Sequence, residues 1–246
     1  VRWPFWLKPF QPQANVGHLT IVAKSVSTKM AAPPKLKLTY FNIQGPAEPT
    51  RLALTIGGVE FEDVRVSRDE MLEMRAAGKL LGGGQLPQLE VNDQVLSQSE
   101  AMTRFCGKIS GLYPADPWLA AKVDEVTQLV NQDIRDRLIS PTMRVEDEEK
   151  KAEMRKELAA TKLPEKFALL EKLIQPSGFF VGDSVTLADL HVYVLLNWIG
   201  MEVLDGVPKQ VVLDSAPLTA FVKKMNELPK VAEWNAAKNA EKLPWC

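Results

Sequence analysis

Residues 36–58 read LKLTYFNIQGPAEPTRLALTIGG and combine a strand pattern with a helix pattern. Leu36, Leu38 and Tyr40 alternate with polar residues, which is typical of a β-strand with one buried face. Residues 47–56 then place apolar side chains at helical spacing and stop at Gly57-Gly58, a common end of an α-helix. The sequence therefore predicts a strand that ends near Tyr40 and is followed by a helix.

The same alternation of short strands and helices continues to residue 109. The patterns predict a strand at 61–66, a helix at 70–77, a β-hairpin at 88–96 that turns at Asn92-Asp93, and a helix at 99–109. The predicted order is β-α-β-α-β-β-α. We therefore expect an α/β fold class in this part of the chain, with helices covering a small mixed sheet.

The remainder of the chain shows helical periodicity and no clear strand pattern. Gly111–Pro117 indicates a linker, and helical stretches follow at 118–139, 145–174, 186–201, 216–228 and 230–239, the second interrupted at Pro164. This favours an α/β domain at residues 33–113 followed by an all-α helical bundle at residues 114–246.

Residues 1–32 differ from both parts. They contain Arg2, Lys8, Lys24 and Lys29 but no acid, and charged residues and prolines interrupt their apolar run. That pattern disfavours a secretory signal. We interpret the segment as a leader or upstream extension outside the fold, with the true start at Met30, and an organelle transit peptide is the alternative.

Composition narrows the function classes. The 246 residues are 46% hydrophobic and 25% charged, which is typical of a globular protein. A formal net charge of −1 argues against broad electrostatic binding to nucleic acid or to an anionic membrane. Two histidines and two cysteines, with no CxxC or HExxH motif, disfavour a metal site and a Ser-His-Asp triad and favour a reducing compartment.

Four segments in a fixed order carry a resemblance to a known family. They are LTYFN at 38–42 with Gly45, Ala47-Glu48 and Arg51 after it, LPQLEV at 86–91, QS at 98–99 with Ala101, Arg104 and Phe105, and VGDSVTLAD at 181–189. Together they resemble the cytosolic glutathione transferases, closest to the sigma class. The resemblance implies a thioredoxin-like N-terminal domain, an all-helical C-terminal domain, a homodimer and a cytoplasmic location.

The activity that the resemblance implies is conjugation of the glutathione thiolate to small hydrophobic electrophiles, with glutathione as co-substrate and no metal. A glutathione-dependent isomerase of the prostaglandin D synthase type is one alternative, and a non-enzymatic crystallin or ligand carrier is another. Taken alone, Tyr40 is more typical of a core aromatic residue with its hydroxyl at the surface. By resemblance its hydroxyl is the catalytic group and donates to the glutathione sulfur. Because a free thiol has a pKa of about 8.5, a donor that stabilises the thiolate makes the nucleophile available at neutral pH.

The resemblance also implies a set of binding residues. The glutathione positions are Tyr40, Met71, Arg75, Gly84, Gln85, Leu86, Pro87, Gln98 and Ser99. A cis peptide bond is expected before Pro87. Gln98-Ser99 is expected to hold the γ-glutamyl carboxylate at a helix start, and Arg75 and Gln85 are expected near the glycyl carboxylate. The hydrophobic pocket is expected to contain Phe41, Ile43 and Gly45 and to face residues 135–143.

The sequence departs from the family pattern at three positions. Pro46 stands where many sigma-type sequences have an arginine, and Met71 replaces an indole that usually contacts glutathione. The acid that reaches across the family's dimer aligns near Asn131-Gln132, and Asp133 would replace it only with a register shift of one residue.

Other motifs have structural interpretations. Ser97 and Glu100 fit a capping box at the start of the helix at 99–109, and Thr186 and Asp189 fit a second. We expect Asp189 to be a folding residue, His191 a core histidine and Cys106 an inert thiol.

Overall fold

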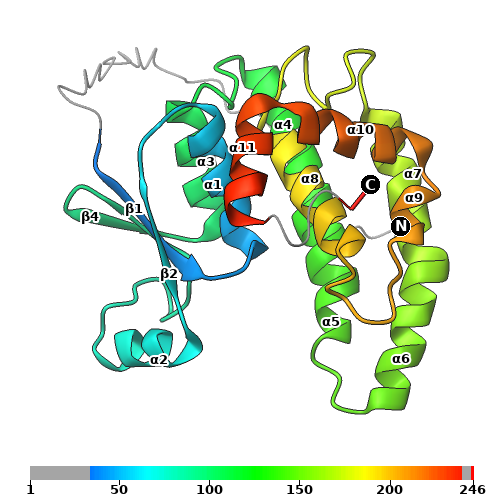
Figure 1. Ribbon diagram of the computed structural model, residues 1–246, viewed down its shortest axis with the longest axis horizontal. Coiled ribbons are helices and arrows are strands. Elements are labelled where there is room, and N and C mark those ends of the chain that lie inside the picture. The colour runs from blue at the N-terminus through cyan, green and yellow to red at the C-terminus, as the bar shows by residue number, and fades with distance from the viewer. Residues whose placement is uncertain (1–33, 240–244) are drawn as a thin grey trace, which may run out of the picture. The chain divides into compact units, whose positions relative to one another are not determined.

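The computed structural model describes residues 34–239 and 245–246 (Figure 1). The predicted leader at residues 1–32 lies outside the described residues. Among the helices that are described, none combines the length and the apolar character that crossing a membrane requires.

A four-stranded sheet forms the first half of the fold. Its strands are β1 (Leu36–Phe41), β2 (Glu62–Val66), β3 (Gln88–Val91) and β4 (Gln94–Ser97), in the spatial order β2-β1-β3-β4. β1 is parallel to β2 and antiparallel to β3, and β3 and β4 form the predicted hairpin. With helices α1 (Glu48–Ile56), α2 (Arg68–Ala76) and α3 (Ser99–Ile109), the predicted order β-α-β-α-β-β-α is confirmed.

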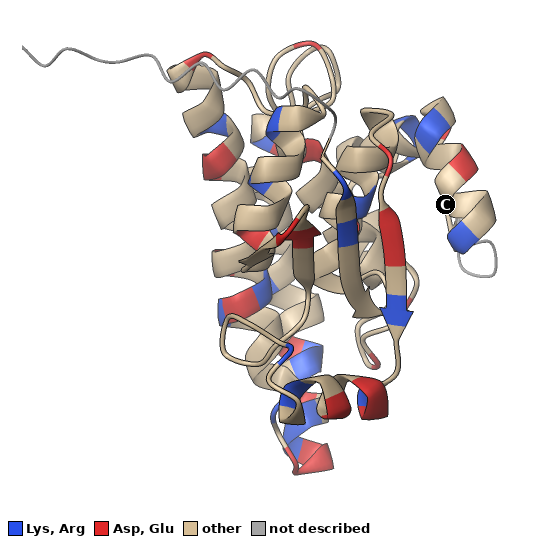
Figure 2. Cartoon of the chain, turned by 90° about the vertical axis from the view of Figure 1, so that its left-hand side faces the viewer, with Lys and Arg blue, Asp and Glu red and all other residues tan. Residues whose placement is uncertain are grey.

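Helices α1 and α3 pack against each other between the sheet and the second, helical half of the molecule (Figure 1). Leu38 and Leu89 on neighbouring strands are fully buried, as are Met102 and Cys106 of α3. The approach of the two halves is close at Gly107 of α3. A Cβ atom there would lie 2.6 Å from the Leu187 side chain, so a larger residue at position 107 would push the halves apart. Seen from the sheet side, acidic and basic residues are interspersed over the strands and helices (Figure 2).

The second half of the described chain is helical, as predicted. Its elements are α4 (Pro117–Gln128), α5 (Ser140–Thr142), α6 (Glu148–Glu157), α7 (Leu163–Leu173), α8 (Leu187–Gly200), α9 (Gln210–Leu213), α10 (Ala216–Glu227) and α11 (Pro229–Lys238). The short helices α5 and α9 and the 3₁₀ turn η2 (Gly45–Ala47) were not predicted, because three or four residues carry too little periodicity.

Two of the long helices contain π-helical segments that the sequence pattern did not predict. Segment η3 (Leu129–Ile139) continues α4, and segment η4 (Leu158–Lys162) joins α6 to α7. At their ends the Ser140 amide donates to the Arg135 carbonyl and the Leu163 amide donates to the Leu158 carbonyl. A proline follows each of these amides. Since proline has no N–H and crowds the carbonyl four residues before it, a wider turn lets each helix continue past the proline.

Helix α8 is buried along most of its length and begins at the predicted cap. Asp189 Oδ2 accepts hydrogen bonds from the Thr186 amide (2.7 Å) and hydroxyl (2.8 Å), and its Oδ1 accepts one from the Phe180 amide (2.9 Å). Burial raises the pKa of Asp189, and these hydrogen bonds act against that rise. Asp189 is therefore a folding residue, as predicted.

The predicted capping box of Ser97 and Glu100 is wrong. Gln98, with a φ of 72°, is the N-cap residue of α3 and makes no side-chain cap hydrogen bond, while Ser97 ends β4. The Glu100 carboxylate instead accepts a hydrogen bond from the Asn131 side chain of η3. A contact between distant segments has replaced the local one.

Candidate active site

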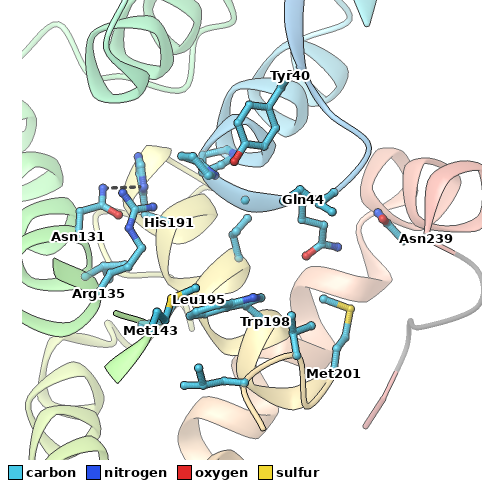
Figure 3. Close-up of a pocket in the computed structure, with 18 of the residues that line it drawn as sticks. Tyr40, Gln44, Asn131, Arg135, Met143, His191, Leu195, Trp198, Met201 and Asn239 are labelled. Carbon is cyan, nitrogen blue, oxygen red and sulfur yellow. Dashed lines mark hydrogen bonds between the residues drawn. The ribbon is translucent and has the colours of Figure 1, made fainter. Parts of the chain in front are cut away.

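A cavity with a volume of about 990 Å³ opens between the end of β1 and the helical half (Figure 3). This is the upper end of the size typical of small-molecule pockets, roughly 300–1,000 Å³. One wall comes from Tyr40 and residues 42–46, and the other from η3, α8 and the end of α11. The apolar part of the lining is formed by Ile43, Pro46, Pro49, Val130, Met143, Val194, Leu195, Trp198, Met201, Val203, Leu204 and Ala237.

Tyr40 lies at the upper rim with its hydroxyl directed into this cavity (Figure 3). The residue is buried, and its ring packs closely over Gly45, where a Cβ atom would lie 2.7 Å from the Tyr40 hydroxyl oxygen. Burial raises the pKa of Tyr40, although the positive charges of Arg51 and Arg135 act in the opposite direction. The hydroxyl is therefore protonated at neutral pH and can donate a hydrogen bond.

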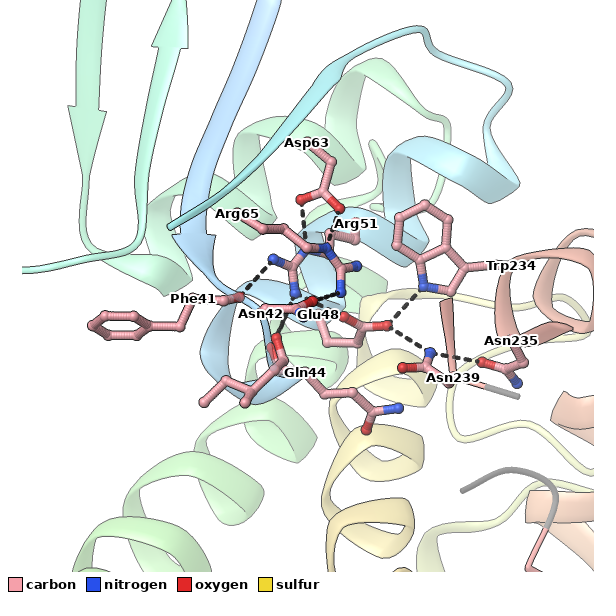
Figure 4. A network of polar contacts seen from close by, with 11 residues as sticks. Phe41, Asn42, Gln44, Glu48, Arg51, Asp63, Arg65, Trp234, Asn235 and Asn239 are labelled. Atoms are coloured by element: carbon pink, nitrogen blue, oxygen red, sulfur yellow. Dashed lines mark hydrogen bonds and ion pairs between the residues drawn. The ribbon is translucent and has the colours of Figure 1, made fainter. Parts of the chain in front are cut away.

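Buried Arg51 fixes the backbone that follows Tyr40 (Figure 4). Its Nη1 donates to the Ile43 carbonyl (2.7 Å) and its Nη2 to the Phe41 carbonyl (3.3 Å). Its Nη1 also pairs with Glu48 (3.1 Å) and its Nε with Asp63 (2.9 Å). Because one guanidinium holds both the loop and two carboxylates, the loop beneath Tyr40 is held in one conformation.

Arg65 extends this network on β2. Its Nε donates to Asp63 (2.8 Å) and its Nη1 to the Asn42 side chain (2.8 Å). The sequence pattern predicted Arg51 only as part of a family motif and predicted no role for Arg65. The available signal was an arginine on an otherwise apolar helix face, which requires a buried acid as partner.

The strand register brings three predicted glutathione positions into one row. Thr39 pairs with Gln88, and Gln88 pairs with Ser97 on the next strand. Since these pairs are antiparallel, the next step along each strand places Tyr40, Pro87 and Gln98 beside one another. The Leu86-Pro87 peptide bond is cis, as expected. Ser99, which follows Gln98, is the first residue of α3.

The other predicted glutathione positions lie on α2 and on the connection from α2 to β3, outside the cavity lining. Arg75 Nε donates to the Gly84 carbonyl (2.7 Å), which joins the end of α2 to this connection. Gln85 and Leu86 follow Gly84, and Met71 is buried in α2. The predicted positions thus occupy the sheet side of Tyr40, while the cavity occupies its helical side.

The predicted hydrophobic pocket overlaps this cavity in part. Ile43 and Gly45 line it, and so do Arg135, Ser140 and Met143 of the predicted stretch 135–143. Phe41 is not among the lining residues. Its ring packs edge-on against Tyr40, with ring centroids 5.2 Å apart.

A polar cluster at the back of the cavity was not predicted. The Asn131 amide donates to Nδ1 of His191 (3.1 Å) and also to Glu100. Burial lowers the pKa of His191 to about 3, with smaller contributions from the charges of Arg135 and Arg104, so the ring is neutral. His191 is therefore a satisfied buried histidine, as predicted, and it also lines the cavity.

The remaining expectations concern the positions at which the sequence departs from the family pattern and the thiol of Cys106. Pro46 lines the cavity. Asn131 is buried and hydrogen-bonded within the chain, and Asp133 pairs with Arg137 (2.5 Å) and Lys166 (3.6 Å). Cys106 is fully buried, and burial raises the pKa of its thiol to about 12, so the thiol is inert as predicted. Within the described residues, no group of three or more His, Cys, Asp or Glu side chains is arranged to hold a metal ion.

The Tyr40 hydroxyl lies at the end of a strand in a small mixed sheet and faces a largely apolar cavity lined by the helical half. This arrangement is typical of two-domain proteins that join a thioredoxin-like N-terminal domain to a helical C-terminal domain. Two sequence families match in the expected order: "Glutathione S-transferase, N-terminal domain" at residues 36–106 and "Glutathione S-transferase, C-terminal domain" at residues 132–238. Glutathione S-transferase 1 of Ascaris suum is 32% identical over 209 residues, which cover 82% of this chain and 96% of that protein. The chain belongs to the glutathione S-transferase family.

Solved structures support the same fold. The glutathione S-transferase of Ascaris lumbricoides superposes with a TM-score of 0.72 at 31% identity, over 83% of this chain and 98% of that one. A structure described as prostaglandin synthase D of Nilaparvata lugens superposes with a TM-score of 0.73 at 28% identity, over 86% of this chain and 99% of that one.

Proposed function

We propose that the chain is a glutathione transferase that joins the glutathione thiolate to small hydrophobic electrophiles. The observation that carries the proposal is the position of Tyr40, whose hydroxyl faces the apolar cavity and whose place on β1 is next to those of Pro87 and Gln98 in the strand register. A thiolate held on the sheet side would meet an electrophile bound on the helical side at this hydroxyl.

The proposed glutathione site follows the row of residues across the strands. The backbone of Leu86 beside Pro87 would pair with the cysteinyl unit, and Gln98-Ser99 at the start of α3 would hold the γ-glutamyl carboxylate. Arg75, Gln85 and Gly84 would lie toward the glycyl end, and Met71 would contribute an apolar contact. The Tyr40 hydroxyl would donate to the sulfur and stabilise the thiolate without removing its proton.

Finer features of the family are also part of the proposal. We assign residues 33–113 to the glutathione-binding domain and residues 114–246 to the helical domain, in agreement with the two matched regions. Assignment to the sigma class, a homodimer and a cytoplasmic location rest on the motifs alone. The hydrogen bonds of Asn131 and the ion pairs of Asp133 give no support to either residue as an acid that reaches across a dimer.

The proposal is tested with Tyr40→Phe, assayed by conjugation of chlorodinitrobenzene to glutathione. The variant removes the hydroxyl that would donate to the thiolate, and we expect the loss of this one donor to lower kcat by about 100-fold. Tyr113→Phe is the matched control, because the Tyr113 hydroxyl donates to Asp124 (3.0 Å) and is not part of the cavity lining. Equal activity of the Tyr40 variant and the native chain would remove Tyr40 from the mechanism.

A second candidate is a glutathione-dependent isomerase, which the similarity to the Nilaparvata lugens structure favours. Isomerisation of a prostaglandin endoperoxide in the presence of glutathione distinguishes it from conjugation. A chain retained on immobilised glutathione but inactive in both assays would instead support the non-enzymatic alternative.

A further inference from the structure

The large cavity combines an apolar body with several positive charges. Its lining includes four basic residues, Arg65, Arg135, Arg155 and Lys238, whereas Asp205 is the one acid among the described residues that line it. A purely apolar electrophile would leave these charges without a partner in the bound state. The balance of charge therefore points to a ligand that carries a negative group.

Two of the arginines already have partners. Arg155 forms an ion pair with Asp205 and donates to the Asp205 carbonyl (2.9 Å). Arg65 is bound to Asp63 and Asn42 on the sheet side. Both guanidinium groups are therefore held by the protein and contribute to its structure.

Arg135 differs from both. Its side chain makes no hydrogen bond with any of residues 34–239 or 245–246, and its ion pair with Asp136 is long, with 3.7 Å between Nε and Oδ1. Asp136 itself is exposed. Glu100 also faces Arg135. Burial raises the pKa of the Glu100 carboxyl, and its hydrogen bond to Asn131 and the Arg135 charge act against that rise. Glu100 does not line the cavity. The guanidinium is thus available to a ligand.

Arg135 extends from the π-helical segment η3 into the cavity, on the wall that faces Tyr40. Figure 3 shows the side chain extending from η3 toward Asn131 and His191, on the wall that faces Tyr40, with Leu195 and Trp198 below. Its charge also acts on the pKa of both Tyr40 and His191. Tyr40 and Arg135 therefore line the same cavity, with Trp198 below both (Figure 3).

We infer that the electrophiles of this chain carry a carboxylate on an aromatic or other apolar body, and that Arg135 binds this carboxylate. The inference rests on the proposed function and specifies its substrate class. A guanidinium matches a carboxylate with two parallel N–H···O bonds, which a neutral substrate cannot form. In the reaction the thiolate forms a bond to the carbon that carries the leaving group, chloride departs with its electron pair, and the carboxylate is unchanged.

The test compares two ligands of the same ring system, one with a carboxylate and the other with its neutral methyl ester. They are the chloronitrobenzoate with chlorine para to the carboxylate and ortho to the nitro group, and the methyl ester of the same acid. Binding of each to the full chain without glutathione is measured by calorimetry, and kcat/KM is then measured with glutathione. The native chain is expected to bind the benzoate more tightly than the ester.

Arg135→Gln is expected to weaken benzoate binding by about tenfold, the lower end for a lost charge-assisted hydrogen bond because the group is partly exposed. Ester binding should change by less than about twofold. Arg137→Gln is the matched control: it removes the same charge from the same segment, but Arg137 is 71% exposed, pairs with Asp133 and is not part of the lining. It should change neither ligand.

The outcomes test the carboxylate site at Arg135 separately from the proposed conjugation of glutathione. Equal binding of benzoate and ester by the native chain, or equal weakening of both ligands by Arg135→Gln, overturns the inference. A loss of kcat with both substrates and unchanged binding would mean that Arg135 acts on the thiolate, which also overturns it. Selective binding through Arg135 without turnover of either compound upholds the carboxylate site and rejects conjugation as the function.

Discussion

The Trp234 indole donates a 2.7 Å hydrogen bond to the Glu48 carboxylate, joining residues 186 positions apart in the chain (Figure 4). Glu48 opens α1 and Trp234 lies on α11, so this bond connects the sheet half to the last helix. The same carboxylate pairs with Arg51, which holds the loop beneath Tyr40. The end of the helical half is thereby linked to the backbone of the site.

Trp234→Phe is expected to lower the free energy of unfolding by about 1–3 kcal/mol, because a buried carboxylate loses a donor. Trp118→Phe is the control, since Trp118 is 72% exposed and its replacement should change stability by less than about 0.5 kcal/mol. Urea denaturation measures both. Equal losses in the two variants would contradict the importance of the bond.

Arg51→Met is expected to destabilise the chain by about 3–5 kcal/mol, because it leaves buried Glu48 without its cation and removes one from Asp63. Arg104→Met breaks a pair with Asp124 in which both side chains are about one-third exposed, and should lower stability by about 0–1 kcal/mol. Thermal denaturation compares the two variants. A similar shift in Tm would count against a structural role for the Arg51 network.

Gly45→Ala should lower conjugation activity through Tyr40. The new methyl group would lie 2.7 Å from the Tyr40 hydroxyl oxygen, and the φ of 48° is already unfavourable for alanine. Gly58→Ala isolates the backbone effect, because Gly58 has a φ of 65° but no atom within 4 Å of the added Cβ. Both variants should lose about 1 kcal/mol of stability from the backbone strain. Loss of activity in the Gly58 variant as well would show that the effect does not pass through Tyr40.

Stability should fall in mild acid because of His191. Its pKa is lowered from 6.5 to about 3 by burial, so the unfolded chain binds a proton in this range while the folded chain does not. Stability from this group is therefore present above pH 6.5 and lost as pH falls toward 3. The loss between pH 7 and pH 5 is about 2 kcal/mol.

The measurement is urea unfolding at pH 7 and pH 5 for the native chain and for His191→Gln. Glutamine does not titrate and can accept the hydrogen bond from Asn131. His18, the other histidine of the sequence, is present in both proteins, so the difference in slope reports His191. Parallel pH profiles would mean that His191 is charged or solvated in the folded state.

Local patterns were sufficient for most of the fold. The alternation at residues 36–41 and the turn at Asn92-Asp93 identified the sheet, and Gly57-Gly58 marked the end of α1. Burial does not alternate strictly along β1, because Leu38, Thr39 and Tyr40 are all buried. The ring of Phe41, the next residue, packs against Tyr40 and does not line the cavity, which the sequence pattern did not predict.

Contacts between residues far apart in the sequence account for the features that the local patterns did not predict. Glu100 was predicted to cap its own helix, but Asn131 binds it, and no local pattern encodes a partner 31 residues away. The π-helical segments end before Pro141 and Pro164, and prolines alone predict a kink without specifying a wider turn. Arg135 lies on η3, so the sequence pattern could not predict that its guanidinium would line the cavity.

The row formed by Tyr40, Pro87 and Gln98 makes the site sensitive to chain length within the strands. The position of each of these residues in the row is fixed by the register in which its strand pairs with the neighbouring strand. Deleting one residue inside β3 would turn its side chains to the opposite face and carry Pro87 out of line with Tyr40, although no residue of the row would be lost. Insertions and deletions in β1, β3 and β4 should therefore be rare among functional variants, even where substitutions at the same positions are common.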